Sequence, residues 1–220
     1  MGVAIVHNDS TIIVDGLHDF YESDYLPTDS TVLKKVLLRQ QPFRNIVGIA
    51  VTHRHNDHFD SAVITTVANV HVSAMLMGSD QIRQRLGSGI QNRVILASKS
   101  PIRVRPNLTV ILQKIPQVNP PRHSAVDNIR FEINWDGFRI IHFGDADISP
   151  ESISGIKEKP DVIIIPEWFL ANEATLLLKK ISPANIIVTH ISPLGAATYK
   201  QEPATTFFRR YGDKIILKTN

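Results

Sequence analysis

The dipeptide Asp136-Gly137 separates two apolar segments, IRFEINW (129–135) and FRIIHF (138–143). An Asp-Gly pair between two such segments predicts a tight β-hairpin, because glycine tolerates the positive φ that a two-residue turn needs. The middle of the chain is therefore expected to contain an antiparallel pair of strands. A doubly wound parallel sheet has no ready place for this hairpin, so a sandwich of two sheets with helices outside is favoured.

Short strands and helices alternate along the rest of the chain, with no repeat and no linker between them. Strands are predicted at residues 3–6, 11–15, 45–51, 70–74, 94–97, 102–105, 108–115, 161–166, 185–190 and 214–218. Helices are predicted at residues 28–41, 61–69, 79–87, 149–158, 173–181 and near 200–210. We therefore expect one domain over residues 1–220.

The first three helices carry polar residues that predict where each begins. Asp29 or Ser30 is expected to cap the first helix, Asp60 the second and Ser79 the third, because short polar side chains accept from the free N–H groups there. The spacing of apolar residues in the first helix predicts a buried stripe of Val32, Leu33, Val36 and Leu37.

Composition excludes several classes of function. The chain has 220 residues, 43% apolar and 20% charged, which is typical of a soluble globular protein. It has no cysteine, so disulfides, thiolate metal sites and cysteine nucleophiles are excluded. The net charge of +3 is too small to suggest a partner as acidic as a long nucleic acid.

The sequence also carries predictions about location. No apolar run approaches the roughly 18 residues of a membrane helix, so no membrane span is expected. The N-terminal segment lacks the features of a signal peptide, which favours a cytoplasmic protein. The alternative is a periplasmic or secreted protein whose chain has been trimmed.

The segment THRHNDHFD (52–60) concentrates metal-binding side chains directly after the buried strand NIVGIAV. His53 and His55 stand two apart in an extended segment, so their side chains point to the same side. Asp57 and His58 follow where the chain turns toward a helix. Imidazole and carboxylate ligands suit zinc, and also iron or manganese. Without a cation these groups would crowd together, so we interpret them as a site for two metal ions.

Three further candidate ligands lie where other strands end or begin. Asp145 follows the strand FRIIHF, His190 follows the strand NIIVT, and His123 lies in a proline-rich loop before a strand. Ligands tend to collect at such positions in layered folds. His142 is interpreted as a packing or orienting residue, and Asp147 as a rival to Asp145.

These segments together resemble the metallo-β-lactamase superfamily. THRHNDH matches its H-x-H-x-D-H signature, and a strand ending in an aspartate precedes it, here TIIVDG with Asp15. His123, Gly144-Asp145 and His190 follow in the order of the later motifs of the superfamily. The resemblance covers essentially the whole chain. It implies an α/β (α+β) fold, the four-layer αββα sandwich of two mixed sheets with helices on the outer faces.

The resemblance also implies a metal-dependent hydrolase with two metal ions per chain, zinc in the first instance. It implies a first metal bound by His53, His55 and His123, and a second bound by Asp57, His58 and His190, with Asp145 bridging. The most similar branch includes lactonase-like enzymes that act on ascorbate 6-phosphate and phosphodiesterase-like hydrolases.

Two divalent cations would lower the pKa of a shared water, so that hydroxide could attack a carbonyl carbon or a phosphorus near neutral pH. Asp57 is the expected catalytic residue, because its second oxygen can orient this nucleophile. Asp15 is expected to accept the free N–H of a metal-bound histidine.

Substrate contacts are expected from Trp168, Arg122 and His18. Trp168 follows the buried strand DVIIIP, and Arg122 precedes His123. Each residue has an alternative: Trp168 anchors the next helix, Arg122 is a solvated surface residue, and His18 is structural, as His71 is expected to be.

The expected reaction is hydrolysis of a small-molecule lactone, ester or amide. Three alternatives stay open, namely a phosphodiesterase acting on a small phosphodiester, an iron-dependent oxidoreductase on the same scaffold, and a binding module with a vestigial metal site. The intact set of ligands argues against the last. The sequence leaves the oligomeric state open.

Overall fold

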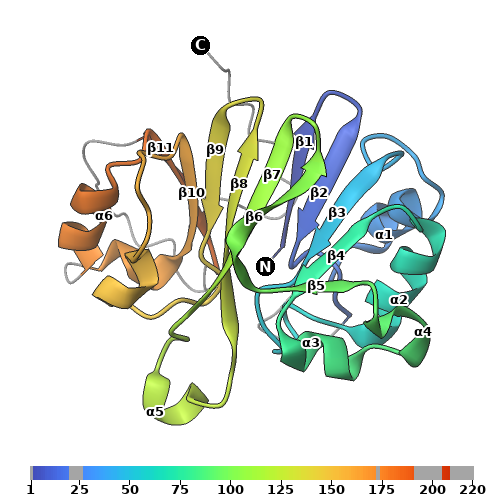
Figure 1. Ribbon diagram of the computed structural model, residues 1–220, viewed down its shortest axis with the longest axis horizontal. Coiled ribbons are helices and arrows are strands. Elements are labelled where there is room, and N and C mark those ends of the chain that lie inside the picture. Colours follow the sequence, from blue (N-terminus) through green and yellow to red (C-terminus); the bar gives the residue numbers. More distant parts are fainter. Residues whose placement is uncertain (1, 20–26, 172–173, 191–204, 209–220) are drawn as a thin grey trace. The chain divides into compact units, whose positions relative to one another are not determined.

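The computed structural model describes residues 2–19, 27–171, 174–190 and 205–208. The chain divides into two compact units, Met1–Lys99 and Ser100–Asn220. Each unit is built on a mixed β-sheet with helices beside it (Figure 1). The expected class of fold, with two mixed sheets and flanking helices, is therefore confirmed.

The sheet of the first unit has the order β1-β2-β3-β4-β5. Its strands are β1 (Val3–His7), β2 (Ser10–Val14), β3 (Ile46–Ala50), β4 (Met75–Gly78) and β5 (Val94–Leu96). β1 and β2 form an antiparallel pair, and β2 to β5 are parallel. The helices are α1 (Ser30–Leu37), α2 (Ser61–Val70), α3 (Asp80–Arg85) and α4 (Ser88–Gln91).

Helices α1 and α2 pack against this sheet through apolar side chains. Val36 of α1 and Val67 of α2 are fully buried in one cluster with Ile13 of β2 and Ile49 of β3. All five residues of β3 are buried, as expected for a strand covered on both faces. The three predicted caps are present: Asp29 accepts from Thr31 N and Val32 N, Asp60 from Val63 N, and Ser79 from Ile82 N.

The sheet of the second unit has the order β12-β11-β10-β9-β8-β7-β6. Its strands are β6 (Ser98–Arg105), β7 (Leu108–Ile115), β8 (Asn128–Trp135), β9 (Phe138–His142), β10 (Val162–Pro166), β11 (Asn185–Thr189) and β12 (Thr205–Phe208). Its helices are α5 (Pro120–His123), η1 (Pro150–Ile153), η2 (Glu167–Leu170) and α6 (Thr175–Ile181), the two η elements being 3₁₀-helices.

The predicted hairpin joins β8 and β9. The two strands pair antiparallel, and the turn residues Asp136 and Gly137 have φ values of 52° and 84°, as a two-residue hairpin requires. β9, β10, β11 and β12 are parallel to one another, so their carboxyl ends lie at the same edge of the sheet. Phe143, Ile163, Ile165 and Phe169 are fully buried in the apolar cluster of this unit.

Several predicted elements were wrong. Residues 70–74 do not form a strand, because α2 continues to Val70 and the strand β4 begins only at Met75. The intervening turn is fixed by His71, whose buried ring bonds to the carbonyl of Val36 at 2.8 Å. Alternating β-branched residues predicted a strand there, but a tertiary contact decides the conformation.

Other predictions differ from the structure in the exposure of one residue and in the type of element formed. Val32 is 38% exposed, because the apolar spacing identifies the buried face of α1 but not how far along the helix the packed surface extends. Of the residues near 200–210 that were expected to form a helix, the described ones, 205–208, form the strand β12, which pairs parallel to β11. The strand predicted at 214–218 lies outside the described residues. α4 was not predicted.

The helix predicted at residues 149–158 is only the 3₁₀-helix η1, and a buried arginine accounts for this. Arg130 of β8 is fully buried and donates to the carbonyls of Ser152 at 2.7 Å and Ser154 at 3.0 Å, and it pairs with Glu132. These carbonyls are thereby held by the sheet rather than by an α-helix. Burial lowers the pKa of Arg130, and the Glu132 carboxylate offsets part of that shift.

None of the helices in the described part of the chain is long and apolar enough to cross a membrane.

We predict that Arg130→Met lowers the free energy of unfolding by about 3–5 kcal/mol, because the buried Glu132 carboxylate loses its closest cation and keeps only Arg139, 3.8 Å away. Urea denaturation of the metal-free protein measures the change. The control is Lys114→Met, because the side chain of Lys114 is 64% exposed and its ion pair with Asp127 should contribute less than about 1 kcal/mol. Equal losses in the two variants would contradict the structural role of the buried pair.

Candidate functional site

The first unit places polar side chains at the carboxyl ends of β2 and β3. Asp15 follows β2 directly and has a φ of 53°, and its backbone N–H donates to the carbonyl of Ala50 at 3.0 Å. The segment 51–58 follows β3 and carries the histidines. We call Asp15, Thr52, His53, His55, Asp57 and His58 the N-terminal cluster.

The Asp15 carboxylate is the hub of the N-terminal cluster. It is 2% exposed and accepts from Thr52 N at 2.7 Å, from Thr52 Oγ1 at 2.6 Å and from His58 Nδ1 at 2.9 Å. Hydrogen bonds of this kind are what a buried carboxylate needs. They also hold the strand end of β2 to the loop that follows β3.

These bonds fix the tautomers of two histidines. The Thr52 hydroxyl donates its only proton to Asp15, so it must accept from Nδ1 of His53, which lies 2.9 Å away. His58 likewise donates from Nδ1 to Asp15. In the neutral imidazoles, Nε2 of His53 and of His58 therefore carries the lone pair that a metal ion requires.

The remaining members lie beside these two rings. The ring centroids of His53 and His58 are 4.1 Å apart, and those of His53 and His55 are 4.6 Å apart. Nε2 of His53 lies 3.0 Å from Nδ1 of His55, and Nε2 of His58 lies 3.3 Å from Oδ2 of Asp57. The four side chains that the sequence predicted as ligands in this loop therefore do lie together.

The second unit brings together a second group of residues, at the carboxyl ends of the parallel strands β9, β10 and β11. Asp145 follows β9, and His190 follows β11 with a φ of 58°. Their side chains approach to 3.6 Å between Nε2 of His190 and Oδ2 of Asp145. The ring of Trp168, from η2, meets the ring of His190 edge-on at 4.9 Å. We call Asp145, Trp168 and His190 the C-terminal cluster.

Hydrogen bonds of His142 and Asn128 hold the turn that presents Asp145. His142 is 2% exposed, and its Nδ1 accepts from the backbone N–H of Gly144 at 3.1 Å. Gly144 has a φ of 57°, and Asn128 of β8 donates to the carbonyl of Phe143 at 3.0 Å. His142 is thus a packing and orienting residue, as the sequence indicated.

The other predicted residues lie in different surroundings. His123 and Arg122 belong to α5, where His123 is half-buried and Arg122 is exposed. Figure 1 shows α5 projecting at the connection between β7 and β8. His18 is only 4% exposed, and burial lowers its pKa from 6.5 to about 4, so its ring is neutral at physiological pH.

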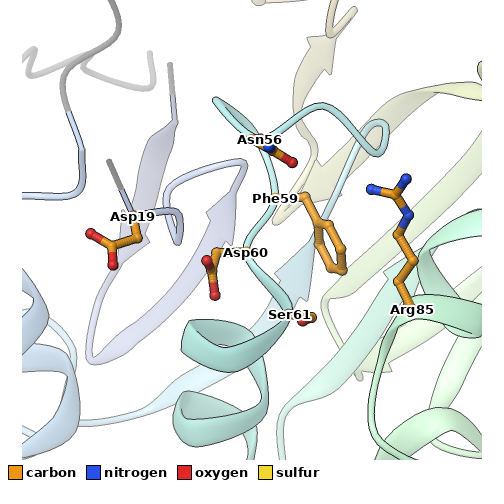
Figure 2. A pocket seen from close by; sticks show the side chains of 6 residues that line it. All are labelled: Asp19, Asn56, Phe59, Asp60, Ser61 and Arg85. Atoms are coloured by element: carbon orange, nitrogen blue, oxygen red, sulfur yellow. The ribbon is translucent and has the colours of Figure 1, made fainter. Parts of the chain in front are cut away.

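A pocket of about 290 Å³ lies beside the loop of the N-terminal cluster. Asn56, which lines it, lies between the candidate ligands His55 and Asp57, and Phe59, which also lines it, directly follows His58. Arg85 enters from α3 and also donates to the carbonyl of Arg54 at 3.1 Å. Figure 2 shows the lining residues, namely Asp19, Asn56, Phe59, Asp60, Ser61 and Arg85. The lining is mostly polar and carries charges of both signs.

Sequence reasoning missed Thr52. The only available signal was a hydroxyl residue immediately before the first histidine of the cluster. Its role depends on the approach of Asp15, which is 37 residues earlier in the chain.

The sequence and the fold were compared with those of known proteins. A family model described as a beta-lactamase superfamily domain matches residues 11–201. No curated protein matches the sequence.

Solved structures with the same fold include three from bacteria. A protein assigned as a metal-dependent hydrolase from Parabacteroides distasonis has a TM-score of 0.68 at 16% identity, covering 94% of this chain and 88% of its own. The metallo-β-lactamase fold protein YhfI from Bacillus subtilis has a TM-score of 0.60 at 19% identity, with 89% and 80% covered. Zn²⁺-bound PqqB from Methylobacterium extorquens has a TM-score of 0.55 at 12% identity, with 86% and 75% covered.

We predict that Thr52→Val lowers the free energy of unfolding of the metal-free protein by about 1–3 kcal/mol, because Asp15 and His53 each lose a buried partner. Thr52→Ser keeps the hydroxyl and should lose less. Nitrogen-15 NMR of the histidine rings should show a shift of His53 toward the Nε2–H tautomer in the valine variant alone. Wild-type stability and an unchanged tautomer in Thr52→Val would contradict the relay through this hydroxyl.

Proposed function

The chain belongs to the metallo-β-lactamase superfamily of metal-dependent hydrolases, and we propose that it hydrolyses a small molecule at a centre of two zinc ions. One observation carries this proposal: Asp15 orients His53 and His58, directly or through Thr52, so that both buried rings offer an Nε2 lone pair. Metal-bound histidines commonly show this arrangement, in which the ring nitrogen away from the metal donates to an oxygen acceptor.

We propose that the metal ligands are the residues that match the superfamily motifs. In this proposal His53, His55 and His123 would hold one metal ion, Asp57, His58 and His190 would hold the other, and Asp145 would serve both. The assignment follows the order of the superfamily motifs along the chain, and the Asp145 and His190 side chains lie at the carboxyl ends of parallel strands, as the histidine loop after β3 does.

The donor chemistry fits zinc. Every proposed ligand offers a nitrogen or a carboxylate oxygen, and the chain has no cysteine that would compete. Two of the rings are held through Nδ1 by oxygen acceptors, as metal-bound histidines commonly are. The similar structure of PqqB is a Zn²⁺-bound one. Iron or manganese would accept the same donors, so the identity of the metal has to be measured.

When bound, the two cations lower the pKa of a coordinated water and polarise the electrophile. Asp57 then has two tasks, because a carboxylate has two oxygens: one is a ligand, and the other accepts a hydrogen bond from the attacking water and orients it. Asp15 stays behind the imidazoles and keeps their protons on Nδ1. His190 is 16% exposed, which leaves the C-terminal cluster partly open to a substrate.

The substrate we propose is a small lactone, ester or amide. The pocket beside the N-terminal cluster is about 290 Å³, which is near the lower end of the range of roughly 300–1,000 Å³ that is typical of small-molecule sites. Arg122 is exposed in α5 and is the proposed contact for an anionic group of the substrate. His18 is buried, so we assign it a supporting role instead of the substrate contact that the sequence suggested.

A panel of substrates tests the reaction class. Zinc-loaded protein is incubated with nitrocefin, a homoserine lactone, a simple ester and bis-p-nitrophenyl phosphate. Turnover of one of the first three, lost on chelation and restored by zinc, supports the proposal. Turnover of the phosphodiester alone would identify a phosphodiesterase, and no turnover of any carbonyl substrate by fully loaded protein would count against the proposed substrate class.

We predict that His55→Ala removes most of the bound metal and all activity, because a ligand is lost. Asp57→Asn should retain much of the first metal while turnover falls by about 10²-fold or more, because the amide cannot orient the water as the carboxylate does. Metal content by plasma emission spectrometry and turnover under saturating zinc measure both effects.

The control for these variants is His71→Ala. Its ring is buried and bonded to the carbonyl of Val36, so metal content should match the wild type even if stability falls. Two metals per chain in His55→Ala, or near-normal turnover in Asp57→Asn, would contradict the assigned roles.

A further inference from the structure

Trp168 connects the segments that follow two different strands. It lies in η2, immediately after the central strand β10, whose neighbours in the sheet are β9 and β11. Its Nε1–H donates to the carbonyl of Ala146, beyond β9, at 2.9 Å. Its ring meets His190, beyond β11, edge-on with centroids 4.9 Å apart and planes at 67°.

Anchoring of η2 is carried by the next two residues. Phe169 is fully buried and Leu170 is 4% exposed, and both belong to the apolar cluster of the second unit. Phe169 also packs on Phe143 with ring centroids 5.6 Å apart. Trp168 is only partly buried at the side of that cluster. Packing of η2 therefore does not require an indole ring with its N–H at position 168.

Trp168 contacts two segments whose backbones are conformationally constrained. His190 has a left-handed backbone with a φ of 58°, and Asp145 follows Gly144, whose φ is 57°. Ala146 is the residue directly after Asp145. A side chain bonded to Ala146 and packed on His190 fixes both the strand end that carries the carboxylate and the orientation of the imidazole, which lie 3.6 Å apart.

We infer that Trp168 is a positioning residue that holds His190 and the Asp145 segment in the geometry needed to bind a metal ion. This inference rests on the proposed role of Asp145 and His190 as ligands. We infer this role for Trp168 in place of the substrate contact that the sequence suggested. Residues that orient metal ligands commonly change metal affinity by about 10- to 100-fold when they are replaced.

The test compares three variants. Trp168→Leu removes both the ring and the N–H, and Trp168→Phe keeps an aromatic ring but loses the N–H. Trp135→Phe is the matched control, because Trp135 is the other tryptophan of the chain, is 4% exposed in the same unit, and lies beside the hairpin turn at the amino-terminal end of β9, opposite the end that carries Asp145. For each variant, zinc dissociation constants are measured by competition with a chromophoric chelator, and the visible absorption of the cobalt-substituted protein is recorded.

The expected result is graded. Trp168→Leu should weaken the more weakly bound zinc by about 10-fold or more and change the cobalt absorption of that site. Trp168→Phe should recover part of the affinity, because its ring still packs on His190. Trp135→Phe should bind zinc and cobalt as the wild type does, even where its melting temperature falls.

Two results would overturn the inference while leaving the proposed function intact. One is wild-type zinc constants and cobalt absorption in Trp168→Leu. The other is an equal loss of affinity in Trp168→Leu and Trp135→Phe, which would indicate general destabilisation of the unit. Failure of the wild-type protein to bind zinc or cobalt would instead overturn both the inference and the proposed function.

Discussion

One buried carboxylate organises the N-terminal cluster of this protein. Asp15 is almost fully excluded from solvent and holds Thr52 and His58 by direct hydrogen bonds, and His53 through the Thr52 hydroxyl. A buried charge of this kind is costly unless every lone pair has a donor. Here the same bonds that satisfy the carboxylate also decide which nitrogen of each imidazole keeps its proton. One set of hydrogen bonds thus offsets the cost of burying the charge and also leaves the Nε2 lone pairs available for a metal ion.

Parallel strands explain where the reactive groups lie. Asp15 and the histidine loop follow adjacent parallel strands of the first sheet, while Asp145, Trp168 and His190 follow three adjacent parallel strands of the second. Asp15 and His190 both have left-handed backbones, which are uncommon for residues with a side chain and occur often at functional sites. In each sheet, the chain turns sharply at the point where it presents a polar group.

Much of this could be predicted from the sequence, because the signals were local. The Asp136-Gly137 turn, the caps at Asp29, Asp60 and Ser79, and the all-apolar strand β3 depend on a few neighbouring residues. The spacing of histidines and aspartates in THRHNDH likewise predicted their grouping. The family followed from the order of these motifs along the chain.

The failures have a common physical cause, because each depended on contacts between distant segments. The turn at residues 71–74 depends on a bond from His71 to Val36, and the shortened helix after residue 149 depends on Arg130 of β8. Thr52 gained its role from Asp15, and the contacts of Trp168 with Ala146 and His190 likewise join segments that follow different strands. Periodicity and composition carry no information on such pairings.

The central claim is that Asp15 leaves Nε2 of His53 and of His58 to bind the metal ions, and crystals of the zinc-loaded protein can test it directly. Diffraction data collected on both sides of the zinc absorption edge would locate the metals without reference to the chain. The account predicts two anomalous peaks per chain, roughly 3.5–4 Å apart, one bound by Nε2 of His53 and the other by Nε2 of His58. Zinc bound through Nδ1 of either ring, or no peak beside these histidines, would contradict it.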